Sequence, residues 1–326
     1  MNIPIIDMTH LFLLLLGFVV GLLTGFSGVG GGFLITPALN ILGFDMVYSI
    51  GTGFASIAVN TFWGGWRHHR YGNVDLKLGI IMGLSSVLGV EIGKSLVLYL
   101  EKLNLVGSYV RITYIVLLLF ISTSMFKEYY QYRKTKQKES KSGEGGMEEK
   151  KPPLASRISR IKIPPKISLP RSGINSMSIW VLIVSGVLIG FLSGFMGIGG
   201  GFIGFPLLIY VIGVPTLLAI GTSLVQVFLT SCFGTILYAI RGRVEWISVL
   251  VILAGSLIGV QVGVNVTKYV TGVRIRGLFA LFLFAVAASI FLKQINLVTS
   301  STYLLMGSAF LLSFVIMFPL IKRLLA

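Results

Sequence analysis

The feature that most constrains the fold is a glycine-rich pattern that occurs twice in the chain. Residues 17–39 read GFVVGLLTGFSGVGGGFLITPAL, and residues 186–208 read GVLIGFLSGFMGIGGGFIGFPLL. At an offset of 169 residues the glycines coincide from Gly17/Gly186 to Gly32/Gly201, and a proline follows in both copies. A match of this length indicates gene duplication, and transporters are commonly built from two copies of one structural unit.

The duplication continues beyond the glycine-rich pattern. With an offset of 170 residues, Gly51-Thr52 aligns with Gly221-Thr222, and Asp75 aligns with Glu245. We expect this acidic pair to cap helix starts, where a negative charge is favoured. Further along, Gly89-x3-Gly93 aligns with Gly259-x3-Gly263.

Long apolar runs make this a membrane protein. Only 12% of the residues are charged, against roughly a quarter in soluble proteins, and the mean hydropathy is +0.90. Several windows of about 20 residues are almost free of charge, which is the length of a transmembrane helix. The composition excludes a soluble cytosolic enzyme and a disordered chain. It predicts an all-α polytopic protein of the cytoplasmic (cell) membrane.

One polar segment divides the chain. Between Lys127 and Arg171 there are 13 Lys/Arg and 5 Asp/Glu, so this segment carries +8 of the total charge of +16. Basic segments next to membrane helices stay in the cytoplasm and contact anionic lipid headgroups, so the charge does not indicate nucleic-acid binding. We expect a first membrane repeat at 1–126, a basic cytoplasmic linker at 127–176, a second membrane repeat at 177–300, and an extra C-terminal transmembrane helix at 301–326.

The charge distribution also bears on the orientation of the repeats. With the linker inside and left out of the count, an inverted second repeat places 8 Lys/Arg inside and 5 outside, whereas a parallel one gives 6 and 7. The count favours two inverted, pseudo-symmetric repeats, and inversion requires an odd number of crossings per repeat. Each repeat is then a Gly-rich broken helix or re-entrant hairpin, at 10–44 or 177–213, followed by three transmembrane helices.

The glycine cores are the first candidate substrate site. Consecutive glycines interrupt a helix, and irregular backbone at membrane depth persists only where protein or a water-filled cavity surrounds it. The N–H groups at the start of the next half-helix form a partial positive pole that suits a small anion. The alternative is that the glycines only allow close helix packing. The candidates are Gly28, Gly30, Gly31, Gly32, Gly197, Gly199, Gly200 and Gly201.

A polar stripe on the following helix is the second candidate. It comprises Thr52, Ser56 and Asn60 in the first repeat, and Thr222, Gln226 and Thr230 in the second. The spacing of four residues places each set on one helix face, in otherwise apolar surroundings. These side chains line the substrate path, or they form interhelical hydrogen bonds only.

Few ionisable residues fall within the apolar runs. Glu91 is a candidate for proton coupling, although Lys94 lies three residues later and the two can form an ion pair. Arg111 and Arg274 begin related stretches, where they recruit an anion or extend to lipid headgroups. Residues 67–70, two arginines and two histidines, are expected to anchor a loop.

The doubled GxxxGxxxGxxGxGGGFxxxPxL pattern, followed in both halves by Ile-Gly-Thr at 50–52 and 220–222, resembles the TauE/SafE family of sulfite and organosulfonate exporters. The resemblance covers both halves and leaves out the linker and the termini. It implies a secondary transporter that exports a small sulfur-containing anion such as sulfite, sulfoacetate or a related sulfonate. It also implies a homodimer that uses neither ATP nor any other cofactor.

Other functions fit less well. Gly25-Phe26-Ser27-Gly28 matches the GxSG form of an intramembrane serine protease, but the second copy has Met196 in place of the serine. The glycine pattern itself therefore accounts for the match, and we expect no enzyme and, with a single cysteine, no multi-cysteine metal site. Import of an inorganic anion such as sulfate or thiosulfate, and a non-transporting membrane sensor, are the alternatives that the sequence leaves open.

Overall fold

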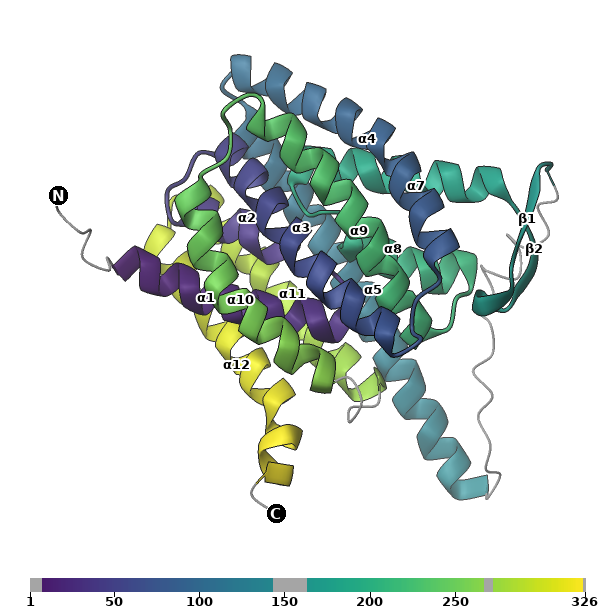
Figure 1. The fold of residues 1–326 in the computed structure, drawn as a ribbon. Coiled ribbons are helices and arrows are strands. Elements are labelled where there is room, and N and C mark those ends of the chain that lie inside the picture. Colours follow the sequence, from purple (N-terminus) through teal and green to yellow (C-terminus); the bar gives the residue numbers. More distant parts are fainter. Residues whose placement is uncertain (1–7, 143–162, 267–271, 325–326) are drawn as a thin grey trace. The chain divides into compact units, whose positions relative to one another are not determined.

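A computed structural model describes residues 8–142, 163–266 and 272–324, most of which are helical (Figure 1). The helices of the second repeat follow those of the first at offsets close to 170 residues, as the duplication predicts. The first repeat contains α1 (Met8–Ser27), α2 (Gly32–Ile41), α3 (Met46–Arg70), α4 (Leu76–Lys102) and α5 (Val106–Ser142). The second contains α7 (Ile179–Met196), α8 (Gly201–Leu207), the π-helical turn η2 (Leu208–Ile212), α9 (Thr216–Ala239), α10 (Trp246–Val266) and α11 (Gly272–Gln294), and α12 (Val298–Leu324) follows.

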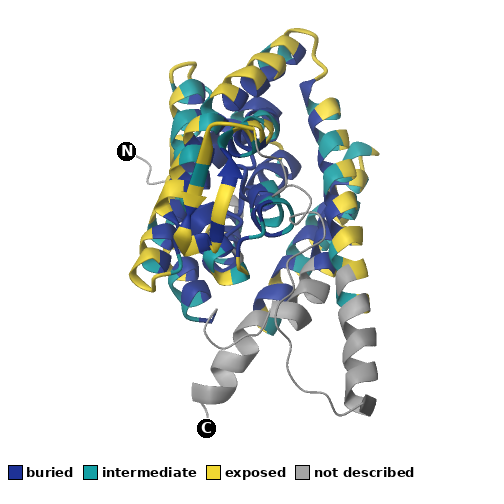
Figure 2. Cartoon of the chain, turned by 90° about the vertical axis from the view of Figure 1, so that its right-hand side faces the viewer, coloured by how far each residue is buried: buried dark blue, intermediate teal, exposed yellow. Residues whose placement is uncertain are grey.

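Among the described residues, six helices are long and apolar enough to cross a membrane: α4, the first part of α5, α7, α9, α10 and the first part of α12. Their outward faces are apolar as well, and Figure 2 shows exposed residues along these faces and buried ones between the helices. On α4 the exposed large side chains recur every four residues, at Ile80, Leu84, Leu88, Ile92 and Leu96. A helix that is apolar on both its inner and its outer face belongs in lipid, which confirms a polytopic helical membrane protein.

The segment expected to be a linker is partly structured. Helix α5 continues to Ser142, and a two-stranded antiparallel sheet joins β1 (Lys166–Leu169) to β2 (Ile174–Ser178) through the 3-10 turn η1 (Pro170–Ser172). The fold is therefore not purely helical. The hairpin folds because its apolar side chains Leu169, Ile174 and Met177 are buried in one cluster with Leu78 of α4 and Leu182 of α7.

The described chain forms two compact units. The first unit contains Met1–Val110 and Pro152–Asn265, and thus the first four helices of each repeat. The second unit contains Arg111–Lys151 and Val266–Ala326, and thus most of α5 together with α11 and α12. Within the second unit, Ser122 of α5 donates a hydrogen bond to the carbonyl oxygen of Ala280 on α11, at 2.8 Å.

Glycines explain why both repeats share one compact unit. Helix α7 packs against α4 of the other repeat so closely that a Cβ atom on Gly190 would overlap the main-chain carbonyl of Ser86. The symmetry-related Gly21 of α1 has the same relation to Ser256 of α10. The contacting pairs are Gly186–Met82, Gly190–Ser86 and Gly194–Val90 on one side, and Gly17–Ile252, Gly21–Ser256 and Gly25–Val260 on the other. We call these two sets the glycine ladders; each joins one repeat to the other by backbone contact.

The equivalent helices α3 and α9 lie side by side and run in opposite directions (Figure 1). Gly51, near the start of α3, lies against Arg243, which follows the end of α9. Gly221, near the start of α9, lies against Asn73, which follows the end of α3.

The glycine-rich segment of the second repeat folds back on itself. Leu182, in the first turn of α7, and Ile212, at the end of η2, belong to the same buried cluster, together with Ala219 of α9. The segment α7–α8–η2 therefore begins and ends at the same end of the first unit, with its glycine core at the far point.

The glycine ladders give a direct test by substitution. We expect Gly190→Ala and Gly21→Ala each to lower the free energy of unfolding by about 1–3 kcal/mol, because the added methyl group forces two helix backbones apart. Gly307→Ala on α12 is the matched control, since nothing lies within 4 Å of its added Cβ atom. Thermal unfolding of the three variants in detergent measures the difference. Equal midpoints for all three would contradict backbone contact at the ladders.

Candidate functional site

The helix of each glycine-rich segment is interrupted at the glycine core that the sequence identifies. We call the interruption between α1 and α2 the first break, and that between α7 and α8 the second break. Between α1 and α2, Gly28, Gly30 and Gly31 have φ angles of 72°, 83° and 72°. Between α7 and α8, the φ angles of Gly197, Gly199 and Gly200 are 74°, 70° and 90°. These left-handed conformations are unfavourable for residues with a side chain, which explains why glycine recurs at the same positions in both repeats. Gly32 and Gly201 are the first residues of α2 and α8.

The two breaks meet each other at the centre of the first unit. A Cβ atom on Gly32 would lie 2.5 Å from the carbonyl oxygen of Ile198, and one on Gly201 would overlap the carbonyl oxygen of Val29. The equivalent residues Phe33 and Phe202 stack on one another, with 5.0 Å between their ring centroids. The structure therefore brings the eight predicted glycines together at one junction, with the starts of α2 and α8 beside it.

Hydroxyl groups satisfy the carbonyl groups that the breaks leave without helical partners. Ser223 of α9 donates to the carbonyl oxygen of Gly28 at 2.7 Å. At the equivalent place in the other repeat, Thr36 of α2 donates to the carbonyl oxygen of Gly197 at 3.1 Å. Ser223 aligns with Gly53, and a Cβ atom on Gly53 would lie 2.7 Å from the Thr36 hydroxyl. Different residues thus supply the same hydrogen bond in the two repeats.

The two threonines that begin the polar stripes connect the repeats. The Thr52 hydroxyl accepts a hydrogen bond from the main-chain N–H of Glu245 at 3.0 Å, and the Thr222 hydroxyl accepts one from the N–H of Asp75 at 2.9 Å. Asp75 is the N-cap of α4 and accepts from the N–H of Leu78, which confirms the capping role predicted for this residue. The hydrogen bonds described for both threonines are interhelical; a place in the substrate path stays a prediction for them.

The last residue of each stripe also bonds to the other repeat. Ser256 of α10 donates to Asn60 at 2.6 Å, and the equivalent Ser86 of α4 lies 2.6 Å from the hydroxyl of Thr230. Ser56 donates to the Thr52 carbonyl in its own helix, and Gln226 donates through Nε2 to Thr230. Two buried atoms of the stripes have no hydrogen-bond partner among the described residues, namely Asn60 Nδ2 and Gln226 Oε1.

Sequence reasoning missed one pair of residues at the junction. His68 and Tyr238 occupy equivalent positions in the last turns of α3 and α9, and both are buried. Tyr238 donates to the carbonyl oxygen of Gly194 at 3.0 Å, and His68 Nε2 lies 3.0 Å from that of Gly25. Each holds the last ladder glycine before a break. Residues 67–70 form the end of α3, and carbonyl groups of residues 67–69 accept hydrogen bonds from the turn at 71–73, in keeping with the expected loop anchor. The offset of 170 residues would have paired His68 with Tyr238.

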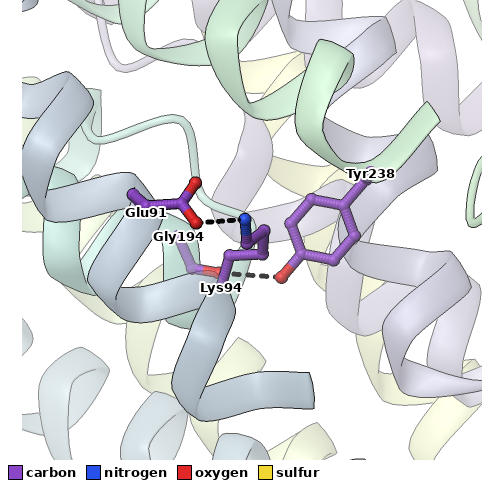
Figure 3. A network of polar contacts seen from close by, with 4 residues as sticks. All are labelled: Glu91, Lys94, Gly194 and Tyr238. Carbon is purple, nitrogen blue, oxygen red and sulfur yellow. Dashed lines mark hydrogen bonds and ion pairs between the residues drawn. The ribbon is translucent and has the colours of Figure 1, made fainter. Parts of the chain in front are cut away.

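Glu91 forms the ion pair that the sequence offered as the alternative to proton coupling. Its Oε1 atom lies 2.5 Å from Lys94 Nζ; the Lys94 side chain is buried, with 3% exposed, whereas 49% of the Glu91 side chain is exposed. Figure 3 shows this pair beside the Tyr238–Gly194 hydrogen bond. Lys94 follows Gly93, which packs on Gly194 and Phe195 at the end of α7. A buried cation therefore lies next to the second break, where the equivalent residue near the first break is Val264.

The arginine candidates lie elsewhere. Arg111 belongs to the second compact unit, where its Nε atom donates to Gln294 at 2.6 Å. The side chain of Arg274 lies outside the described residues. Recruitment of an anion by either arginine stays a prediction.

The sequence model of a family described as "Sulfite exporter TauE/SafE" matches residues 13–290, which include both repeats and both breaks. The chain belongs to this family. The resemblance that the doubled glycine pattern carries is thereby confirmed.

Curated relatives agree on the general activity. The chain is 25% identical over 269 residues to the "Probable membrane transporter protein YunE" of Bacillus subtilis, covering 80% of this chain and 89% of the relative. It is 23% identical to YdhB of the same organism, with coverage of 86% and 99%. A probable membrane transporter protein of Haemophilus influenzae is 27% identical, with coverage of 87% and 98%. No solved structure gives a significant match. The family and these relatives identify the protein as a membrane transporter.

The reciprocal threonine bonds can be tested by removing one hydroxyl at a time. We expect Thr52→Val and Thr222→Val each to cost about 1–3 kcal/mol of stability, because a main-chain N–H loses its acceptor within the protein. Thr123→Val is the control, since that exposed hydroxyl bonds only to carbonyl groups of its own helix. Chemical or thermal unfolding in detergent compares the three. Losses no larger than that of the control would rule out a structural role for the hydroxyls.

Proposed function

We propose that this protein is a secondary transporter that exports a small sulfur-containing anion, such as sulfite, sulfoacetate or a related organosulfonate, across the cytoplasmic membrane. The observation that carries the proposal is the junction of two broken helices at the centre of the first unit. Broken helices that meet in this way form the substrate sites of many duplicated transporters, because their exposed N–H groups attract anionic groups. The TauE/SafE family supports the sulfur-containing substrate class.

The proposed topology has inverted repeats. The antiparallel course of α3 and α9 supports it, as does the glycine-rich segment of the second repeat, which begins and ends at one end of the unit. With the basic segment 127–176 in the cytoplasm, the second break is reached from the cytoplasmic end of α7, and the first break from the opposite side. Movement of one ladder-joined helix pair, α1 with α10, against the other, α7 with α4, then exposes the junction alternately to the two sides of the membrane.

The membrane potential favours export. With the inside negative, each elementary negative charge that leaves the cell releases ~2.3 kcal/mol per 100 mV. A uniporter is therefore thermodynamically sufficient, and the pairing of Glu91 with Lys94 gives that carboxylate a structural role without a proton cycle. We accordingly propose that transport needs no proton gradient.

Flux through the purified protein in proteoliposomes tests the proposal. Vesicles are loaded in turn with sulfite, sulfoacetate, taurine or sulfate, and an inside-negative potential is imposed with and without a pH gradient. We expect efflux of sulfite or a sulfonate with the potential alone, and none from protein-free vesicles. Efflux of sulfate alone would overturn the assignment of sulfite or a sulfonate as the substrate. Flux that requires the pH gradient would overturn uniport, and Glu91→Gln would then show whether Glu91 carries the proton.

The junction itself can be blocked. We expect Gly200→Val to reduce flux at least about tenfold, because a side chain at a φ angle of 90° strains the backbone and its Cβ atom would lie 2.5 Å from Ile189. Gly307→Ala, outside both breaks, is expected to retain wild-type flux. Size-exclusion chromatography confirms that each variant is folded. Wild-type flux through folded Gly200→Val would exclude the second break as part of the transport path.

A further inference from the structure

The two breaks are surrounded by polar side chains at equivalent positions, but only one set has hydrogen-bonding capacity left over. Around the first break, Thr24, Ser56 and Thr61 all donate to carbonyl oxygens of their own helices, at 2.7–3.0 Å. The equivalent residues around the second break are Ser193, Gln226 and Ser231. Their Oγ, Oε1 and Oγ atoms have no hydrogen-bond partner among the described residues.

These three side chains lie against the second break. The Ser231 hydroxyl lies 2.8 Å from the position of a Cβ atom on Gly199, and Gln226 Nε2 lies 3.1 Å from that position on Gly200. The Cβ atom of Ser193 lies 3.8 Å from the same point on Gly200. All three residues are at most 1% exposed. At the first break, Thr61 presents its Cγ2 methyl group to Gly30, and the Thr24 hydroxyl, which donates within α1, lies 2.9 Å from the Cβ position of Gly31.

One end of the Gln226 amide is engaged by Thr230. The amide nitrogen donates to the Thr230 hydroxyl at 2.9 Å, and that hydroxyl lies 2.8 Å from the Gln226 main-chain carbonyl and 2.6 Å from Ser86. The amide oxygen therefore points the other way, where a Cβ atom on Gly204 would lie 2.6 Å from it. In the first repeat Ile35 stands in place of Gly204 and Ser56 in place of Gln226, so this arrangement has no counterpart there.

Three buried atoms of the first repeat also have no hydrogen-bond partner among the described residues, namely Asn60 Nδ2, His10 Nδ1 and His68 Nδ1. His10 lies near the start of α1, and His68 contacts Gly25 of α1 through Nε2. Asn60 accepts from Ser256, and its contact is thus with α10. The side chains nearest to Gly30 and Gly31 come from Val227, Thr61, Ile57, Val20 and Thr24. The free amide group of Asn60 therefore belongs to the contact between α3 and α10.

Three buried polar atoms without partners are costly unless a ligand completes them. Two are hydroxyl oxygens, whose protons are available to an anionic oxygen; the third accepts a hydrogen bond. This set of groups complements an oxyanion that also carries one N–H or O–H donor.

We propose that the transported anion binds on the second repeat's side of the junction, with its oxygens bonded to the hydroxyls of Ser193 and Ser231 and its own donor bonded to Gln226 Oε1. This inference rests on the proposed function and specifies it further: the two breaks are structurally equivalent, but one of them holds the substrate. The hydroxyls around the first break bond within their own helices, so the first break has a structural role and does not bind the substrate.

The pseudo-symmetry supplies the controls. Ser193→Ala and Ser231→Ala remove a hydroxyl at the second break, and Thr24→Val and Thr61→Val replace the equivalent hydroxyls at the first by methyl groups. In proteoliposomes with sulfite we expect each serine variant to raise the KM about tenfold or more, since a hydrogen bond to a charged group is lost. We expect the KM of each threonine variant to stay within about twofold of the wild-type value, because these hydroxyls already donate to carbonyl groups of their own helices.

A second measurement separates the inference from the proposed function. Sulfite added to the purified protein in detergent raises the unfolding temperature if it binds. We expect that shift in wild type and in both threonine variants, and its loss in both serine variants. Larger effects from the threonine variants, or equal effects from all four, would overturn the one-sided site while leaving sulfur-anion transport intact. No shift and no flux in wild type would instead overturn the proposed function.

The role of Gln226 is tested with two substrates of equal charge. Ethanesulfonate and 2-hydroxyethanesulfonate differ by one hydroxyl donor. We expect wild type to transport the hydroxyl-bearing anion with a KM at least about fivefold lower, within the range of one hydrogen bond, and Gln226→Leu to lose this preference. A wild-type preference for ethanesulfonate, or an unchanged preference in Gln226→Leu, would overturn the assignment of the amide oxygen.

Discussion

The contact of helix backbones along the two glycine ladders determines the architecture of the first unit. In lipid there is no hydrophobic force to press apolar helices together, so association depends on close packing and on hydrogen bonds between helices. The ladders supply the close packing by letting α1 approach α10, and α7 approach α4, without any side chain between them. Because each ladder joins one repeat to the other, neither repeat forms a compact body by itself, and the breaks that end α1 and α7 are brought to the same place.

Hydrogen bonds between the repeats then satisfy main-chain N–H and carbonyl groups that have no helical partner at the breaks and helix ends. Some of these bonds obey the pseudo-symmetry, as the threonine bonds to Asp75 and Glu245 do. Others preserve only the chemistry, as when Ser223 in one repeat and Thr36 in the other bond to the carbonyl groups of Gly28 and Gly197. This second kind shows that duplicated halves diverge in sequence while the need to satisfy buried polar groups persists.

The glycine pattern predicts the helix breaks and their equivalence, because left-handed backbone at three positions is a local requirement that only glycine meets readily. Asp75 is likewise recognisable as a helix cap. The sequence does not predict the hairpin at 166–178, whose formation depends on a buried cluster assembled from α4, α7 and η2. Nor does it distinguish Thr24 from Ser193, since both are small hydroxyl residues one turn before a break. Which of them has a free hydroxyl is decided by hydrogen bonds that only the folded chain shows.

The reciprocal bonds of Thr52 and Thr222 join residues that are synthesised at different times. The N–H of Asp75 at the start of α4 is made 147 residues before the threonine that accepts its hydrogen bond. At 5–20 residues per second, the ribosome takes roughly 7–30 s to bring that partner into the membrane. During this interval the first four helices occupy the bilayer without the acceptor for α4 and without the helices that complete their glycine ladders. During synthesis the first repeat therefore exposes helix faces that lack their partners. These faces must not associate with other membrane helices before the second repeat has been inserted.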